Sequence, residues 1–178
     1  MTNHRYYHDR ITMALDDLLR CQSYCRMMLK NPMGESFSDE RVVYESLFVA
    51  FIISYGRVFN SSNTVDDSFR GEVSNKFGEF RASIIRKQDS RLQKLHERIK
   101  TKRNTAIAHS DAVSRNYQHY TNSPLAIGRN PYYPYDHEEV QWALELTSNL
   151  IVLVGEEQSR IGKIAFERDL FGMPNEGT

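Results

Sequence analysis

The stretch VVYESLFVAFIISYGRVFN, residues 42–60, decides the fold because it has the length of a helix and carries apolar residues on every side. Ser36 or Ser38 can cap its N-terminus, and the acidic Asp39 and Glu40 suit its first turn. A helix that is apolar around its whole circumference is typical of the centre of a helical protein. This stretch therefore predicts the central, buried helix.

Other segments on both sides of this stretch also read as helix. The apolar positions of residues 9–30 recur at steps of three and four before an Asn-Pro pair ends the pattern. Residues 69–87 read as one or two weaker helical pieces, because Gly71 and Gly78 lower the helix propensity. The other expected elements are a helix from Asp89 to about His109, a loop over 112–136, and a helix from Asp136 that Gly155 can interrupt.

These segments together predict an all-α fold. No internal repeat or hairpin pattern of β-branched residues is visible in the sequence. The economical architecture is an antiparallel up-and-down bundle of four long helices with short extra helices. We expect one domain over residues 1–178, with flexible ends at about 1–7 and 172–178.

Composition places the chain among soluble proteins. The 23 Lys and Arg balance the 23 Asp and Glu, so the net charge is zero and a nucleic-acid role needs a local basic surface. The most apolar run, Leu47 to Tyr55, is shorter than the roughly 20 residues that span a bilayer. The N-terminus lacks the apolar core of a signal peptide. We therefore expect a cytoplasmic protein with no membrane partner.

Cysteine and histidine usage argues against a disulfide or a metal site. Cys21 and Cys25 lie one helical turn apart, in poor geometry for a disulfide, so free thiols in a reducing compartment are expected. His137 and the two glutamates after it are not followed by the second histidine of a zinc-binding HExxH helix. We expect no metal and no cofactor.

The stretch KTKRNTAIAHSDA, residues 100–112, carries the candidate chemistry. An arginine binds phosphate through a planar fork of donors, and a histidine with a pKa of about 6.5 exchanges protons near neutral pH. Arg103 and His109 are thus a minimal set for metal-independent RNA cleavage, in which a base activates the ribose 2′-hydroxyl and a cation stabilises the transition state. The product would be a 2′,3′-cyclic phosphate. The plainer alternative is that both residues cap a helix C-terminus.

The segment that leads to this stretch is basic. From Arg81 to Arg103 there are nine Lys or Arg and two acids, which leaves a local charge of +7. Such a surface attracts a polyanion, although it can equally be a solvated face whose partners lie elsewhere in the chain. The residues that we predict to support the site or bind RNA are Lys102, Ser110, Asp111, Arg57, Lys100 and Arg98.

The spacing of the motif argues against a site on one helix face. Six residues of ideal helix turn by about 600°, which leaves Arg103 and His109 about 120° apart around the axis. The two side chains converge only if the helix loosens at its end or if two chains bring two such ends together. Thr105, Ala106 and Ala108 permit close approach of two backbones, so the sequence predicts a homodimer with a shared cleft.

The pattern KRNTAIAHSD resembles the signature of the HEPN superfamily: an arginine, a polar residue next to it, and a histidine four to six residues further on. Arg103, Asn104 and His109 match these positions, and ISYGRVF resembles the preceding helix of abortive-infection-type HEPN proteins of bacteria. The resemblance covers roughly residues 8 to 165, although only the motif is specific. It implies a helical bundle that acts as a dimeric, metal-independent endoribonuclease, with Arg103 and His109 catalytic and Asn104 orienting them.

The resemblance also sets the biological expectations. HEPN ribonucleases often act as toxins in phage defence or in toxin–antitoxin pairs, which makes an antitoxin protein a candidate partner beside RNA. Ser110 and Asp111 stand where the subgroup silenced by nucleotidylation has a tyrosine. Other HEPN domains are non-catalytic. The runner-up function is therefore a HEPN module that binds RNA or a partner protein, and the third is a structural bundle that oligomerises.

Several further residues allow two interpretations each. Arg57 follows an apolar run, so we favour emergence at the helix end or an internal ion pair over a role as a second phosphate ligand. His96 is assigned to the basic face. The tyrosines of the 112–136 loop can stack on bases, but more often such residues anchor a loop to its domain. They are Tyr117, Tyr120, Tyr132, Tyr133 and Tyr135.

Overall fold

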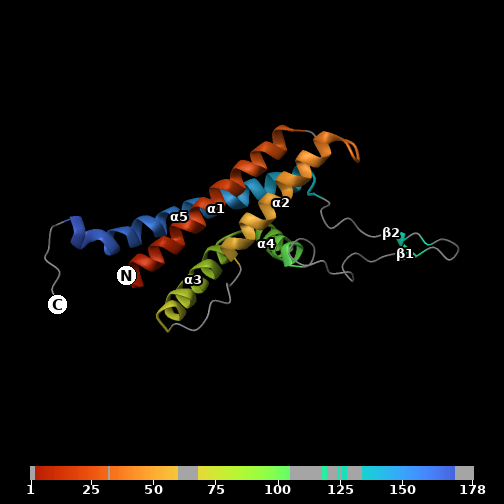
Figure 1. Ribbon diagram of the computed structural model, residues 1–178. Helices are drawn as coiled ribbons and strands as arrows, with labels where there is room; N and C mark the ends of the chain where they lie inside the picture. Colours follow the sequence, from red (N-terminus) through yellow and green to blue (C-terminus); the bar gives the residue numbers. More distant parts are fainter. Residues whose placement is uncertain are drawn as a thin grey trace.

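The protein is all-helical in the residues that the computed structural model describes, apart from one short strand pairing (Figure 1). The expected all-α class is confirmed, whereas the strand pairing was not predicted. The described residues are 3–31, 33–59, 68–104, 118–119, 124, 126–127 and 134–170. Their elements are α1 (Asn3–Lys30), α2 (Asp39–Phe59), α3 (Ser68–Arg86), α4 (Ser90–Lys102), β1 (Gln118–His119), β2 (Ala126–Ile127) and α5 (His137–Leu170).

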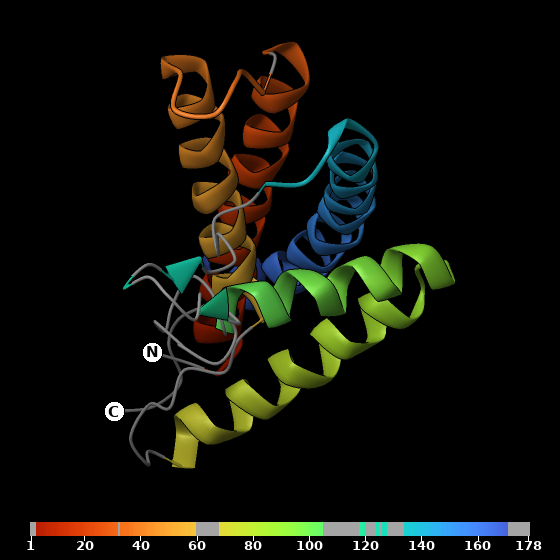
Figure 2. The ribbon, with the colours of Figure 1, turned by 90° about the vertical axis from the view of Figure 1, so that its right-hand side faces the viewer.

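The long helices are arranged in two groups. Helices α1, α2 and α5 lie side by side, with α1 packed against both of the others. Helices α3 and α4 form a hairpin that crosses this group near its middle, as Figure 2 shows. The two strands pair antiparallel, with Gln118 opposite Ile127 and His119 opposite Ala126. The crossing brings the C-terminal end of α4 next to α2, which positions the candidate site.

Polar side chains fix where three of the helices begin. The Ser38 hydroxyl accepts a hydrogen bond from the backbone N–H three residues later, at 3.1 Å, so Ser38 rather than Ser36 caps α2. The Asp89 carboxylate caps α4 in the same way, at 2.9 Å. Asp136 and Glu139 form a reciprocal capping box at the start of α5, with hydrogen bonds of 2.8 and 3.2 Å. These caps explain why α2, α4 and α5 begin at Asp39, Ser90 and His137, close to the predicted starts at Asp39, Asp89 and Asp136.

Helix α1 begins at Asn3, earlier than the start near Asp9 that the periodicity predicts. Residues 3–7 were expected to belong to a flexible end. Tyr7 is instead 2% exposed, and its hydroxyl donates a hydrogen bond to Glu157 of α5 at 3.1 Å. This buried aromatic contact explains why the helix extends to its first turns.

Helix α2 was expected to be buried on all sides, but only its inner half is. Phe48, Phe51 and Tyr55 have no exposed area, whereas Val42 and Ile53 on the opposite side are 58% and 42% exposed. With Val43, which is 54% exposed, these two residues form an apolar surface that we name the outer face of α2. An exposed apolar stripe on an otherwise buried helix is typical of an interface.

Among the described residues, α2 is also the one helix long and apolar enough to cross a membrane, with a mean hydropathy of 1.5 over its most apolar window. Half of that window is buried within the fold. Because the core helix of a soluble protein has the same properties, this is weak evidence for membrane insertion.

The glycines that lowered the expected helicity do not interrupt their helices. Helix α3 runs unbroken through Gly71 and Gly78, and α5 runs unbroken through Gly155. Cys21 and Cys25 are buried and free, as predicted. Burial raises the pKa of the Cys25 thiol to about 12, and it raises the pKa of Cys21 as well, so both thiols stay protonated.

Candidate functional site

The predicted motif begins at the C-terminal end of α4. This helix was expected to run to about His109. Its α-helical part ends at Lys102, and Arg103 and Asn104 continue in a wider, π-type turn. Such turns are often found at functional sites. The course of the chain from this turn to His109 lies outside the described residues, so the convergence of Arg103 and His109 stays a prediction.

Part of the motif lies outside the described residues. His109, Ser110 and Asp111 fall in the segment 105–117, and so do the small residues that were expected at a dimer contact. Their roles stay predictions.

Arg103 crosses α2 at a glycine. A Cβ built on Gly56 would lie 2.9 Å from the Arg103 Cγ and 3.3 Å from its Cδ, closer than real side chains approach. The missing side chain at Gly56 therefore lets the aliphatic part of Arg103 pack directly on the α2 backbone. Beyond this contact, Arg103 Nη1 donates a hydrogen bond to Asn104 Oδ1 at 3.1 Å. The role of Asn104 in orienting Arg103 and His109 stays a prediction.

Arg103 lines a cavity between the two groups of helices. The cavity has a volume of about 510 Å³, and we name it the Arg103 cavity. Its wall combines apolar residues with arginines and aspartates, which suits a ligand that has both an apolar body and a charge. The lining residues are Arg10, Met13, Ala14, Asp16 and Asp17 of α1, Gly56, Arg57 and Val58 of α2, Phe77 of α3, and Arg103.

Arg57 lies on the wall of this cavity in an ion pair. Its Nε donates to Asp17 Oδ2 at 3.1 Å, and its Nη2 contacts the other oxygen of the same carboxylate. This hydrogen bonding raises the pKa of Arg57. The internal ion pair that we favoured is confirmed, and the guanidinium remains 54% exposed at the cavity. A bidentate pair leaves Arg57 less able to bind a phosphate than an arginine without a carboxylate partner.

The other basic residues predicted to support the site have intramolecular contacts of their own. Arg98 contacts Glu139 of α5, and that hydrogen bond raises the pKa of Arg98. Lys100 lies 3.4 Å from Glu97, one turn away on the same helix. At the end of α4, the ammonium of Lys102 lies over the rings of the buried Phe48 and Tyr135. The structure thus gathers Arg103 and Arg57 at one cavity but places Arg98, Lys100 and Lys102 elsewhere on α4.

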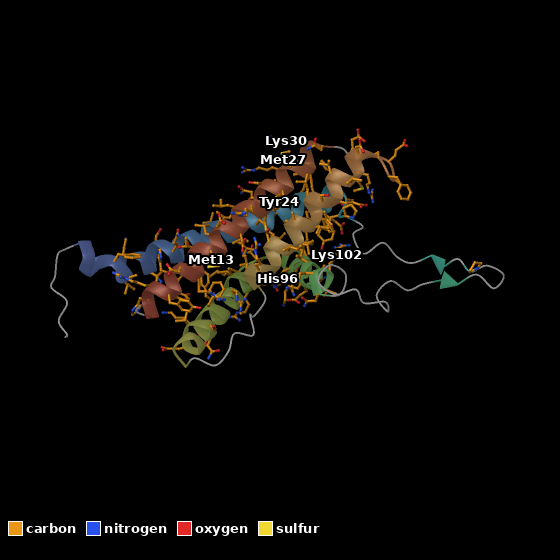
Figure 3. All side chains as sticks on the ribbon, viewed as in Figure 1. Met13, Tyr24, Met27, Lys30, His96 and Lys102 are labelled. Atoms are coloured by element: carbon orange, nitrogen blue, oxygen red, sulfur yellow. The ribbon has the colours of Figure 1, made fainter. Side chains whose placement is uncertain are left out.

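His96 does not belong to the basic face. It is 4% exposed, and its Nδ1 lies 2.7 Å from the hydroxyl of the fully buried Tyr55 (Figure 3). Burial lowers the pKa of His96 to about 4, so the ring is neutral at pH 7. The signal for this was available in the sequence, because His96 follows Leu92 by four residues and precedes Ile99 by three, on the buried stripe.

Tyr135 anchors the described end of the long loop. The residue is 4% exposed, and its ring meets Phe48 edge to face with centroids 4.9 Å apart. The guanidinium of Arg98 and the ammonium of Lys102 lie over the same ring, at 5.4 and 5.7 Å. The favoured anchoring role is confirmed for this tyrosine, whereas Tyr117, Tyr120, Tyr132 and Tyr133 lie outside the described residues.

Comparison with known proteins adds no assignment. No protein-family model, no curated protein and no solved structure matches the chain. In the described part of the chain, no group of three or more His, Cys, Asp and Glu is placed to hold a metal ion. We therefore infer the function from the motif and from the geometry around Arg103.

Proposed function

We propose that this protein is a metal-independent endoribonuclease of HEPN type that acts as a homodimer in the cytoplasm. In this proposal its fold is the HEPN-like, up-and-down bundle of four long helices. Arg103 binds the scissile phosphate, His109 exchanges the protons, and Asn104 orients Arg103. Neither a metal nor a cofactor takes part.

The observation that carries the proposal is that Arg103 lines a cavity and is not paired with a carboxylate in the described part of the chain. Arg20, Arg41 and Arg57 each form an ion pair with an aspartate or glutamate. Arg91, Arg98 and Arg160 do so as well. Within the described residues, Arg103 has no ion pair, and its guanidinium donates a hydrogen bond to the neutral amide of Asn104. A phosphate would supply the missing negative charge.

The proposed reaction needs only these side chains and the RNA. His109 removes the proton from a ribose 2′-hydroxyl, and the 2′-oxygen attacks the adjacent phosphorus. Arg103 stabilises the negative charge that develops on the phosphate oxygens. The bond to the 5′-oxygen of the next nucleotide breaks, and that oxygen takes a proton. The products are a 2′,3′-cyclic phosphate and a 5′-hydroxyl end.

The outer face of α2 supports the homodimer in this proposal. Its exposed Val42, Val43 and Ile53 lie on the same helix as Gly56, which holds Arg103. Burial of these residues against a second copy would remove apolar area from water and bring two motifs to one cleft. Light scattering combined with size exclusion is expected to give twice the chain mass, and Ile53→Glu is expected to shift the protein to monomer. A wild-type monomer that cleaves RNA would contradict the dimeric part of the proposal.

Purified protein incubated with RNA in EDTA tests the catalytic part. We expect wild type to cleave single-stranded RNA and to leave 2′,3′-cyclic phosphate ends, and we expect Arg103→Ala and His109→Ala to be inactive. Cleavage that survives in either variant would refute the assignment of that residue. For the toxin role, induced expression of wild type, but not of His109→Ala, is expected to arrest bacterial growth.

One observation favours the alternative, a non-catalytic HEPN module that binds RNA or a partner protein. The basic residues along α4 are largely engaged within the chain, which leaves the apolar outer face of α2 as a conspicuous uncovered surface. A module of this kind would use that face for an antitoxin or another protein. Absence of cleavage for every RNA tested, with stable capture of such a partner, would favour this alternative.

A further inference from the structure

The Arg103 cavity extends beyond the groups that the proposed reaction uses. Its lining also includes Arg10 of α1 and Phe77 of α3. The motif involves neither residue, and nothing in the sequence pattern singles them out. The volume of about 510 Å³ lies in the range of small-molecule sites, so the cavity has room for more than one phosphate group.

Arg10 is held in place by an aromatic ring rather than by a carboxylate. Its Cζ lies 5.0 Å from the centroid of the Phe77 ring, and Phe77 is 3% exposed. The Arg81 guanidinium lies 4.9 Å from the same centroid and donates a hydrogen bond to the Val58 carbonyl at 3.0 Å, so the ring is fixed from more than one side. In the described part of the chain, Arg10 forms no ion pair. Its N–H donors therefore remain available to an anion.

The two carboxylates of the cavity are already neutralised. Asp16 accepts a hydrogen bond from Arg20 at 3.0 Å, and Asp17 holds Arg57. These aspartates therefore repel an incoming phosphate less than their number suggests. Among the lining cations, Arg10 and Arg103 form no ion pair in the described part of the chain, so their charges are left to attract a ligand.

Apolar surface accompanies the charged residues of the lining. Ala14 and Val58 contribute small buried side chains, and Gly56 contributes backbone. Met13, which Figure 3 shows on α1, is 65% exposed at the rim and has a flexible thioether that adapts to flat ligands. A cavity whose lining combines two such cations with apolar surface fits a nucleotide, which has charged phosphates and a planar base that stacks on apolar side chains.

We infer that the Arg103 cavity seats one nucleotide of the RNA substrate, with Arg10 binding the phosphate next to the scissile one. This inference rests on the proposed function, since it takes Arg103 as the ligand of the scissile phosphate. Arg10 thus positions the RNA and raises its affinity. The base of the bound nucleotide lies beside Met13.

Binding of a non-cleavable RNA separates this inference from catalysis. The probe is a fluorescein-labelled, single-stranded hexanucleotide with 2′-O-methyl groups on every ribose, titrated into the full chain and followed by anisotropy. We expect Arg10→Ala to weaken binding about 10-fold, because a charge-assisted contact to phosphate is lost. Arg26→Ala is the matched control, since Arg26 is an exposed arginine on the same helix outside the cavity. This control is expected to change binding less than about 2-fold.

A second pair of variants, at Met13 on the rim of the cavity, tests where the base lies and leaves Arg10 unchanged. Met13→Asp places a negative charge at the rim and is expected to weaken binding of the same probe about 5-fold, whereas Met13→Gln is expected to bind like wild type. Both changes are at a mostly exposed position, so the helix is expected to tolerate them. Circular dichroism melts check that all four variants fold.

The outcomes distinguish the two proposals. If Arg10→Ala and Arg26→Ala bind the probe equally, the inference is overturned even when wild type cleaves unmodified RNA. If the probe binding depends on Arg10 but unmodified RNA is not cleaved, the nucleotide seat is supported and the catalytic function fails. Equal binding by Met13→Asp and Met13→Gln would show that the base of the bound nucleotide does not lie beside Met13.

Discussion

The body of α4 and its C-terminal end treat positive charge in different ways. Along the body, Arg91, Arg98 and Lys100 each pair with a glutamate. At the end, Arg103 contacts Gly56 and a neutral amide, and it faces a cavity. The local charge of +7 is therefore a poor guide to where a polyanion binds. The location follows from which charges are already paired within the chain, and this comparison can be tested residue by residue.

The largest expected difference is between Arg103→Ala and Arg98→Ala. Both remove one guanidinium from the basic segment. We expect Arg103→Ala to lower the rate of RNA cleavage by about 100-fold or more, because it removes the charge that stabilises the transition state. Arg98→Ala is expected to lower the rate by less than about 3-fold, because the guanidinium it removes is already paired with Glu139. Single-turnover cleavage of one labelled RNA measures both. Equal losses in the two variants would mean that only the overall charge matters.

The second difference concerns the glycine that holds Arg103. A methyl group at Gly56 would meet the Arg103 side chain at 2.9 Å, so we expect Gly56→Ala to displace the guanidinium and to lower cleavage about 10-fold. Gly155→Ala is the control, because no atom lies within 4 Å of its added methyl group. That variant is expected to stabilise α5 by about 0.5–1 kcal/mol and to keep full activity. Cleavage assays and urea titrations report the two effects, and full activity in Gly56→Ala would remove the packing argument.

The third prediction uses His96, which is on the body of α4 but faces the core. Its pKa is lowered to about 4 by burial, from 6.5 in an unfolded chain. Between these pH values the unfolded chain binds a proton that the folded chain does not. The free energy of unfolding is therefore expected to fall as the pH drops below about 6.5, by up to about 1.4 kcal/mol per pH unit. Above about pH 6.5 the contribution of the neutral His96 to the free energy of unfolding is fully present.

Urea unfolding at several pH values between about 7 and 5 checks this, with His96→Gln as the comparison. The variant is expected to show a shallower loss of stability toward low pH, whatever its stability at pH 7. Identical pH dependence in the two proteins would show that His96 is not the titrating group.

The smallest expected effect comes from converting a paired arginine into an unpaired one. Asp17→Asn removes the carboxylate that holds Arg57 at the wall of the Arg103 cavity. We expect RNA to bind about 3-fold more tightly, with a steeper dependence on salt, because one more cation becomes available to phosphate. Anisotropy titrations at two salt concentrations measure this. Weaker binding would indicate that Asp17 itself contacts the RNA.

The parts of the fold that the sequence predicted well are those set by local rules. The repeat of apolar residues located the helices, and Ser38, Asp89 and Asp136 explain where three of them start. The break expected at Gly155 did not occur. A glycine inside a helix costs about 1 kcal/mol relative to alanine, and the packing of the helix residues before and after it outweighs this cost.

The parts that it did not predict depend on contacts between distant segments. The exposed side of α2 could not be separated from its buried side, since both are apolar in the sequence. The cavity between Arg10 and Arg103 joins residues 93 positions apart, which no motif spacing reveals. By contrast, the burial of His96 followed from its place on the apolar stripe, and the basic residues around it concealed that signal.

The contact between Lys102 and Tyr135 has a consequence for how the protein can change. The ammonium lies 5.7 Å from the ring centroid, so Lys102 before the segment 105–133 and Tyr135 after it are in contact. For a loop whose ends are held together, each doubling of its length costs only about 0.6 kcal/mol of loop-closure entropy. Insertions after Asp111, outside the motif, can therefore give the protein new recognition properties while the helices that position Arg103 keep their stability.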